Sequence, residues 1–541
     1  MKGRNIFLNL ILGALCASQA FAAKKDNFLQ LEENGTKKYL VVMEEETRSN
    51  GVINSQYAGL NRSERATQVA HENGLKLNRV YNKVVDGFVV EGDIETLKKL
   101  SNKPGVKYIE QVGKTWLDGT QSSAPWNLDR IDQRGSSLNG TYNYDRTGAG
   151  VTVYVLDSGI QNSHSQFEGR ATSGWDFINN NKGTGTDCNG HGTHVAGTIG
   201  GKTYGVAKSV NLVSVRTQSC SGSGDWSDFI AALDWVVSNG TKPAIIHASI
   251  GGGASNSVDN AIRSAINAGF TVVVSAGNDA KDACTQSPAR VKEALTVGAT
   301  DKNDARASFS NYGQCVDVWA PGVDVRSAYP SSNTATASWQ GTSMAAPHVS
   351  GIAALYLQGA PNAAVASVVN NVMGKVTYGK VNDRKTIDTP NLFAYSRGTS
   401  NTYTAFHRYN NDKIGNHFYT KNWWELQSAP DSSWKYEGVI GYAYRGQQSN
   451  TKPLYRYYHS SQTDHLYTAN YGELGGGGNG WSYNGVAAYL PLSGNTKSLY
   501  RYYSSKIQDH FYTTNWNELE GGNSNWKYEG NIGKLFAGPQ D

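Results

Sequence analysis

Five short, apolar, β-prone runs alternate with helical stretches over residues 119–396, and this alternation limits the possible folds more than any other feature. Their uninterrupted apolar character is typical of strands buried on both faces of a parallel sheet. We therefore predict a doubly wound α/β domain, in which sites form at the carboxyl ends of strands. The expected strands are 151–156, 211–215, 244–249, 271–275 and 294–297, and the expected helices are 194–199, 227–237 and 258–268.

The first 22 residues have the pattern of a secretory signal peptide. Lys2 and Arg4 precede an apolar run over 6–15, and Ala20-Phe21-Ala22 provides a small-residue cleavage site. Because no later stretch reaches about 18 apolar residues, we predict export without a membrane span. The net charge of +5 is small and no basic run stands out, which argues against a nucleic-acid partner.

Four cysteines remain after Cys16 is removed with the signal peptide. An even number in an exported chain favours two disulfides. Three pairings are open to four cysteines, and their spacing does not choose among them.

Residues 23–118 differ from the rest in being rich in Lys and Glu and, after the signal peptide, free of cysteine. Strand-like and helix-like segments follow one another in the order β-α-β-α-β. This order predicts a small open sandwich, with elements at 39–43, 64–73, 87–91, 94–100 and 106–111.

After a short polar linker at 397–403, the chain repeats itself three times over residues 404–541. Arg408, Arg456 and Arg501 mark the same position in the three copies, 48 and 45 residues apart. Because one such unit rarely buries its apolar face alone, we predict a threefold all-β domain, and a trefoil-like fold is one arrangement that would fit. The recurring Tyr, Trp and His residues are expected to form core layers, with ligand binding as the alternative.

Three glycine-bounded segments carry an aspartate, a histidine and a serine at predicted strand or helix ends. Asp157 ends the first strand, His191 begins a helix, and Ser343 lies in Gly341-Thr-Ser-Met-Ala-Ala-Pro-His348. A serine hydroxyl needs an adjacent base to become a nucleophile, and an imidazole titrates near neutral pH. A carboxylate on the second ring nitrogen fixes the tautomer, so these residues are predicted to form a catalytic triad, in the chain order found in subtilisin.

Asn278, in Ser275-Ala-Gly-Asn278 after a predicted strand, supplies an amide side chain. A tetrahedral intermediate needs hydrogen-bond donors for its oxyanion. We predict that Asn278 and the backbone N–H of Ser343 provide them.

Residues 119–396 resemble the proteinase-K-type subtilases, and most of all their aqualysin-like bacterial branch. Besides the catalytic blocks, the similarity rests on segments 124–132, 187–191 and 305–313. The resemblance implies a serine endopeptidase of broad specificity, with disulfides Cys188–Cys220 and Cys284–Cys315. It also implies that residues 23–118 are an inhibitory, chaperone-like propeptide, cleaved near Asp118–Gly119.

The resemblance further implies that a peptide substrate, the expected partner, binds as an extra strand between two glycine-rich segments. Backbone pairing of this kind gives affinity with little sequence preference. Trp226 would form a wall of the S4 pocket, and Ala276 and Gly277 would line an S1 pocket for large apolar side chains. The strand-forming residues would be Gly222, Ser223, Gly224, Ser249, Gly251 and Gly252.

Calcium is the cofactor implied by the resemblance, in a structural role. One site would use Asp317 with the carbonyls of Lys292 and Ala294, where lysine stands at a position that is often proline in the family. A second would use Asp129, Asp132 and Gln133. Oxygen ligands of this kind suit Ca²⁺.

Other interpretations of the same residues are weaker. His194 and His348 are expected to be structural, and a zinc cluster of Cys188, His191 and His194 lacks a fourth ligand. An adhesion protein that uses its repeats and needs the protease only for maturation is the main alternative function, with cell-surface or polymer ligands. A narrow processing protease is disfavoured because the substrate-facing segments carry few charges. We expect a monomer.

Overall fold

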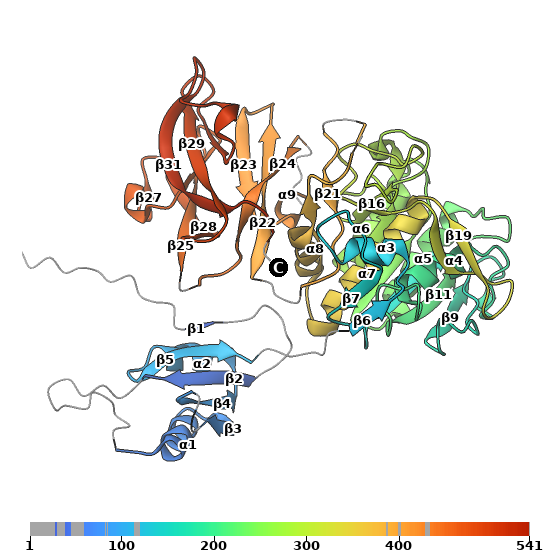
Figure 1. Cartoon of the computed structure of the whole chain (residues 1–541), viewed down its shortest axis with the longest axis horizontal. Helices are drawn as coiled ribbons and strands as arrows, with labels where there is room; N and C mark the ends of the chain where they lie inside the picture. The colour runs from blue at the N-terminus through green and yellow to red at the C-terminus, as the bar shows by residue number, and fades with distance from the viewer. Residues whose placement is uncertain are drawn as a thin grey trace, which may run out of the picture. The chain divides into compact units, whose positions relative to one another are not determined.

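The computed structural model describes residues 28–29, 38–44, 59–81, 83, 85–112, 119–382, 384–385, 388–398, 402–427, 433–448 and 450–539. The chain divides into two compact units, residues 1–114 and 115–541. The predicted signal peptide, residues 113–118 on one side of the expected cleavage site, and linker residues 399–401 lie outside the described residues. Figure 1 shows the elements in chain order from blue to red.

The first unit is a five-stranded sheet in the order β1-β5-β2-β4-β3 with two helices. All five predicted elements are present, and the strands at 28–29 and 76–81 are additional. No side chain of the strand at 76–81 is buried, and its polar and apolar residues do not alternate, which conceals its pattern. Helix α1 begins with a capping box between Asn61 and Glu64, which satisfies free N–H groups. The elements are β1 (Phe28–Leu29), β2 (Lys38–Met43), α1 (Arg62–Glu72), β3 (Lys76–Tyr81), β4 (Gly87–Glu91), α2 (Ile94–Ser101) and β5 (Val106–Gln111).

The second unit begins with the predicted doubly wound domain, built on a ten-stranded sheet. Its order is β10-β9-β11-β8-β12-β14-β16-β17-β21-β20, parallel except at the edge strands β10 and β20. The five predicted strands are β8 (Thr152–Asp157), β11 (Asn211–Arg216), β12 (Ala244–Ala248), β14 (Thr271–Ser275) and β16 (Leu295–Thr300). The others are β9 (Ala171–Asp176), β10 (Asn181–Lys182), β17 (Val318–Pro321), β20 (Thr377–Tyr378) and β21 (Leu392–Phe393).

Helices cover this sheet, and three small hairpins or bridged pairs surround it. The helices are α3 (Trp126–Ile131), α4 (His191–Gly200), α5 (Trp226–Asn239), α6 (Asn256–Asn267), α7 (Thr342–Gly359) and α8 (Val365–Lys375), with a 3-10 turn η1 (Ala283–Thr285). The pairs are β6 (Gly119–Ser122) with β7 (Thr141–Tyr144), β13 (Gly252–Gly253) with β15 (Gln286–Ser287), and β18 (Val325–Ala328) with β19 (Thr336–Trp339). No helix among the described residues has the length and apolarity that a bilayer crossing requires.

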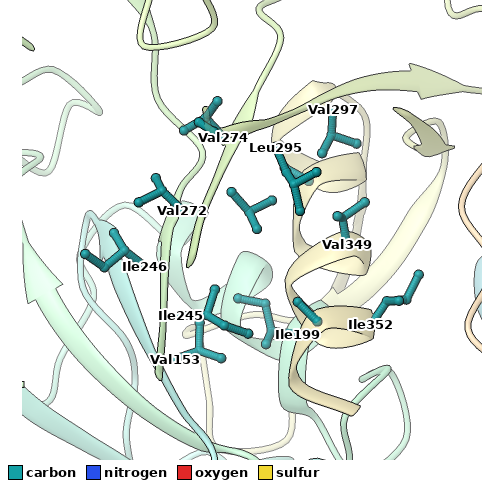
Figure 2. Close-up of a cluster of buried hydrophobic side chains, with 14 of the residues drawn as sticks. Val153, Ile199, Ile245, Ile246, Val272, Val274, Leu295, Val297, Val349 and Ile352 are labelled. Atoms are coloured by element: carbon teal, nitrogen blue, oxygen red, sulfur yellow. The ribbon is translucent and has the colours of Figure 1, made fainter. Parts of the chain in front are cut away.

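The core of this domain includes the sheet, helices α4 and α7, and the buried side chains of α5 and α6. Figure 2 shows strand side chains such as Val153 and Val274 gathered beside Ile199 of α4 and Val349 of α7. Helix α7 is buried along almost its whole length, since small residues allow it to lie close to the sheet. The disulfides are Cys188–Cys220 and Cys284–Cys315, the pairing that the resemblance implies.

The C-terminal part of the second unit is the predicted threefold all-β domain. In each repeat the first strand pairs antiparallel with the second and with the third. The first-repeat elements are β22 (Tyr403–Asn411), β23 (Asn416–Thr420), α9 (Trp424–Gln427) and β24 (Lys435–Tyr444). Then follow β25 (Thr451–His459), β26 (Asp464–Thr468), η2 (Tyr471–Glu473), β27 (Gly477–Gly478) and β28 (Trp481–Pro491), and finally β29 (Thr496–Ser504), β30 (Asp509–Thr513), η3 (Trp516–Glu518) and β31 (Lys527–Phe536).

Three equivalent tyrosines join the repeats at their common centre. The Tyr467 hydroxyl accepts from the N–H of Tyr419 at 2.9 Å, and Tyr512 accepts from Tyr467 at 2.7 Å. Tyr419 closes the cycle by accepting from the N–H of Tyr512 at 2.7 Å. Each repeat therefore completes the hydrogen bonding of the next, which explains why one copy cannot bury its own apolar face.

This cycle predicts a stability effect for a single hydroxyl. Tyr467→Phe leaves the buried N–H of Tyr419 unpaired, so we expect urea unfolding of the full chain with Ser343→Ala to show a loss of about 1–3 kcal/mol. Tyr458→Phe is the matched control, since no hydrogen bond of that hydroxyl is found among the described residues. Equal losses in the two variants would contradict the role of the cycle.

Candidate active site

Asp157 and His191 meet where strand β8 ends and helix α4 begins. The Nδ1 atom of His191 lies 2.8 Å and 2.9 Å from the two carboxylate oxygens of Asp157, which is buried. Helix α4 can approach β8 this closely because residue 192 is glycine. A Cβ atom there would lie 2.1 Å from the carbonyl oxygen of Gly159. The glycines beside His191 therefore allow the pair to form.

The carboxylate of Asp187 holds the first turn of α4. Its Oδ1 accepts from the N–H groups of Asn189 and Gly190, at 3.1 Å and 2.8 Å, and from Ser158 Oγ at 2.9 Å. Its Oδ2 accepts from the N–H and hydroxyl of Thr193, at 2.9 Å and 2.7 Å. A carboxylate that satisfies the free donors of a helix start fixes the backbone there, and so fixes His191.

The surroundings of His191 set its proton affinity. Burial alone lowers the pKa of the ring, but the charge and hydrogen bond of Asp157 and the charge of Asp187 raise it. The net pKa lies above the usual value for histidine. Nδ1 faces Asp157, so Nε2 is the ring atom left for another proton transfer.

Ser343 is the second residue of α7 and lies in the same cleft as His191. Its Oγ donates to the carbonyl oxygen of Ser249 at 3.1 Å, while Ser249 Oγ donates to the carbonyl of Ser343 at 3.0 Å. Within the part of the chain that the structure describes, no hydrogen bond joins Ser343 to His191. Such bonds are often long or misaligned without substrate.

Asn278 follows strand β14 and has a fixed orientation. Its Oδ1 accepts from the N–H and hydroxyl of Thr342, at 2.8 Å and 2.9 Å, which leaves Nδ2 as a donor. A Cβ atom placed on Gly341 would lie 3.7 Å from this Nδ2 and 3.6 Å from the backbone N of Ser343. The two nitrogen atoms therefore flank one small space beside Ser343.

A cleft of about 590 Å³ joins these groups to the predicted substrate-binding segments. Of the predicted substrate residues, Ala276 is fully buried and is not part of the lining. The rest line the cleft, namely Gly222, Ser223, Gly224, Trp226, Ser249, Gly251, Gly252 and Gly277. Sequence reasoning missed Asp279 and Gln286 as further lining residues, joined by a 2.6 Å hydrogen bond.

His247 is a second group that sequence reasoning missed, because it lies inside an apolar strand and nothing marks it. Its ring is fully buried, with Nδ1 2.8 Å from Ser350 Oγ and Nε2 2.7 Å from Ser249 Oγ. Burial lowers its pKa to about 3, so the ring is neutral. Ser249 thereby connects His247 to the carbonyl of Ser343.

The two histidines expected to be structural are both buried and bonded to the main chain. His194 Nε2 lies 3.0 Å from the carbonyl oxygen of Val325, and His348 Nδ1 lies 3.0 Å from that of Met344. Burial lowers the pKa of each to about 4. Cys188 is in a disulfide, so its sulfur is not a free thiolate for zinc.

At the first predicted calcium position, the carboxyl group of Asp317 already has hydrogen-bond donors and a positive charge near it. Asp317 Oδ2 accepts from the N–H of Thr296 at 2.7 Å. Burial raises the pKa of Asp317 to about 8, against hydrogen bonds from Thr296 and the Trp423 side chain and the charge of Lys292. Ala294 precedes strand β16 in the same region. Donors and a cation around one carboxylate fit calcium poorly.

The second predicted calcium position fits better. Asp129 Oδ2 and Asp132 Oδ2 each accept one backbone N–H at 2.6 Å, from Gly140 and Asn143. Asp132 Oδ1 is buried without a hydrogen-bond partner, and burial raises the pKa of this carboxyl. A buried, unpaired carboxylate oxygen beside a second carboxylate suits a hard cation. The carbonyl of Gln133 is already bonded to Arg130 at 3.1 Å.

Comparison with known proteins agrees with this geometry. Residues 148–392 match the subtilase family model, residues 38–112 match the peptidase inhibitor I9 model, and residues 404–536 match a domain of unknown function (DUF5648). An extracellular serine proteinase of Thermus sp. (strain Rt41A) is 52% identical over 323 residues, covering 60% of this chain and 78% of that protein. The chain therefore belongs to the subtilase family, and it is a serine-type endopeptidase.

Two further relatives support the assignment. An alkaline serine exoprotease A of Vibrio alginolyticus is 47% identical over 317 residues, which cover 58% of this chain and 59% of that protein. A crystal structure of a cold adapted subtilisin-like serine proteinase superposes with a TM-score of 0.50 at 47% identity. The match covers 51% of this chain and 100% of the solved one.

The role of Asp187 leads to a prediction about His191. Asp187→Asn removes a negative charge that favours the imidazolium, so the pKa of His191 should fall. NMR titration of the His191 Cε1–H signal in the Ser343→Ala protein measures it. Asp225→Asn, in the same cleft but not bonded to α4, should leave the pKa unchanged. An unchanged or higher pKa in Asp187→Asn would contradict this role.

Proposed function

We propose that this chain is a secreted endopeptidase of broad specificity that cleaves peptide bonds through an acyl-enzyme on Ser343. The observation that carries the proposal is the convergence of Ser343, the Asp157–His191 pair and Asn278 on one cleft. Four separate chain segments supply these groups, and one mechanism uses all of them.

In the first step His191 Nε2 takes the Ser343 proton as Oγ attacks the scissile carbonyl carbon. Rotation about the Cα–Cβ bond of Ser343 moves Oγ from the Ser249 carbonyl toward the ring. Asp157 stabilises the imidazolium that forms, in line with the raised pKa of His191. The imidazolium then protonates the leaving amine, and a water molecule repeats the sequence to release the acyl group.

The developing oxyanion would lie in the space beside Gly341, between Asn278 Nδ2 and the N–H of Ser343. Thr342 holds the other end of the Asn278 amide, so the donor is oriented before substrate arrives. Preorganised donors of this kind usually supply one of the largest catalytic effects.

The substrate backbone would pair with segments 222–224 and 249–252, which present mostly glycine and serine. Such pairing needs few side-chain contacts, so the specificity is broad. Trp226 supports an apolar S4 pocket. Gly277 has no side chain and so leaves room for a large P1 side chain, whereas Asp279 and Gln286 make part of the lining polar. A peptide library varied at P1 and P4 would determine which side chains are preferred.

Residues 23–118 would act as an inhibitory propeptide, supported by the inhibitor I9 match and by the separate first unit. Cleavage near Asp118–Gly119 would release the enzyme. Export is supported by the signal-peptide pattern, and the Thermus relative is named as extracellular. Adhesion as a second function rests on one observation, the exposed aromatic side chains of the second and third repeats.

Calcium would bind at the second predicted position, held by Asp129 and Asp132. A cation there would neutralise two neighbouring carboxylates and pair the free Asp132 Oδ1. Its role is structural, since Asp129 and Asp132 join α3 and the residue that follows it to Gly140 and to Asn143 of β7.

Two substitutions test the mechanism. Ser343→Ala should abolish casein hydrolysis, precursor processing and labelling by a fluorophosphonate. Asn278→Ala should lower kcat about 10²–10³-fold with little change in KM, since it removes a donor used in the transition state. Normal processing by Ser343→Ala would refute the assignment, and an unchanged kcat in Asn278→Ala would refute the oxyanion site.

The calcium proposal predicts an effect on thermal unfolding that is independent of activity. In the Ser343→Ala protein, calcium at about 100 times its Kd should stabilise by about 2.7 kcal/mol and raise Tm. Asp132→Ala should abolish that rise, whereas Asp234→Ala, at an exposed position on α5, should keep it. Differential scanning calorimetry with calcium or EDTA measures both, and an equal rise in Asp132→Ala would exclude this position.

A further inference from the structure

Each repeat of the C-terminal domain carries the same aromatic triad. Its members come from the first strand, from the turn after the second strand, and from the third strand. The triads are His407, Trp423 and Tyr436, then Tyr455, Tyr471 and Tyr483, then Tyr500, Trp516 and Tyr528. Their ring centroids lie 5.1–5.8 Å apart in the first repeat, 5.1–6.2 Å in the second and 4.9–6.3 Å in the third.

The first triad is covered by the catalytic domain. Trp423 is 2% exposed and belongs to the same apolar cluster as the core of that domain. Its side chain also acts on the carboxyl of Asp317, where it lowers the pKa against the larger effect of burial. The equivalent side chains in the other two repeats, Tyr471 and Trp516, are 47% and 39% exposed. One triad therefore has a polypeptide partner, and two equivalent triads face solvent.

An amide group completes the contact in the first repeat. Asn370 of α8 donates from Nδ2 to Asn422 Oδ1 at 2.7 Å, and its Oδ1 accepts from the N–H of Trp424 at 3.1 Å. The atoms equivalent to these two in the other repeats bond to each other instead. Gly472 N–H donates to Asn470 Oδ1 at 3.1 Å, and Asn517 N–H to Asn515 Oδ1 at 3.3 Å.

In the first repeat the Asn370 side chain therefore lies between two groups that hydrogen bond directly to each other in the second and third repeats. Any Asn or Gln side chain has the same donor and acceptor. Opening this single bond, 3.1 Å long in the second repeat and 3.3 Å in the third, is offset by the two bonds gained.

A glycine on the third strand leaves room for the partner in every repeat. A Cβ atom on Gly438 would lie 3.0 Å from the hydroxyl oxygen of Tyr378 in β20 of the catalytic domain. Gly485 and Gly530 are the equivalent residues and have nothing within 4 Å of that position. The space that Tyr378 reaches in the first repeat is therefore open in the other two.

We propose that the second and third repeats each carry a binding surface for polypeptide, formed by the triad, Asn470 or Asn515, and Gly485 or Gly530. Each surface takes an amide group beside an aromatic side chain, as the first repeat takes Asn370 and Tyr378. Polypeptide is the occupant because the one filled copy holds polypeptide through both amide atoms of an asparagine. This deepens the proposed endopeptidase function, since a protein substrate would be held on the same chain as the cleft without being cleaved at these surfaces.

The test uses the full chain with Ser343→Ala, so binding is measured without catalysis. Retention on casein-coated beads should weaken about tenfold or more in Tyr471→Ser/Trp516→Ser, since truncation of an exposed aromatic anchor at each surface removes its main contact. Leu492→Ser/Ile507→Ser is the matched control, because these apolar side chains of the same domain are 58% and 43% exposed. The control should bind casein as the parent does, and urea unfolding should be the same in all three proteins.

Competition by soluble peptides distinguishes recognition of side-chain amides from nonspecific adsorption. A soluble peptide rich in glutamine and phenylalanine should displace the chain from casein, and its glutamate counterpart should not. Unchanged retention in the triad variant, equal weakening in the control, or equal competition by the two peptides would overturn the proposal. So would retention of the parent on chitin or cellulose beads but not on casein, which would identify a polysaccharide surface instead. Because no cleavage is measured, failure here leaves the proposed catalysis untouched.

Discussion

The carboxylate of Asp187 holds the first turn of α4, and the geometry of the candidate site depends on this interaction. Five donors from four residues converge on its two oxygens. With that turn fixed, His191 Nδ1 faces Asp157 at hydrogen-bond distance and Nε2 is left toward the cleft. The same negative charge adds to the larger effect of Asp157 in raising the pKa of His191, so Asp187 acts on both the position and the proton affinity of this ring.

The parallel sheet brings the other groups to the same edge. Asp157 ends β8, Ser249 follows β12 and Asn278 follows β14, and these strands are neighbours in the sheet. Ser343 arrives on α7, whose small residues let the helix lie deep against the strands. The candidate site therefore lies at a sheet edge that is built by apolar packing.

Much of this could be predicted from the sequence because the signals were local. The five central strands were visible as apolar runs, and Asp157, His191, Ser343 and Asn278 each had glycines or strand ends beside them. Strand β3 was missed because none of its side chains is buried and its polar and apolar residues do not alternate. His247 was missed because its hydrogen bonds to Ser249 and Ser350 depend on segments that only the fold brings together. The contact of Trp423 with Asp317 was also unpredictable, since it joins two domains across more than a hundred residues of chain.

The central claim is that Ser343, His191, Asp157 and Asn278 act together on a peptide carbonyl. A crystal structure of the mature enzyme with a peptide boronic acid tests it most directly. We predict a covalent bond from Ser343 Oγ to boron, one boronate oxygen about 2.7–3.1 Å from both Asn278 Nδ2 and the backbone N of Ser343, and His191 Nε2 bonded to the adduct. An adduct on another residue, or a boronate oxygen turned away from Asn278, would contradict the account.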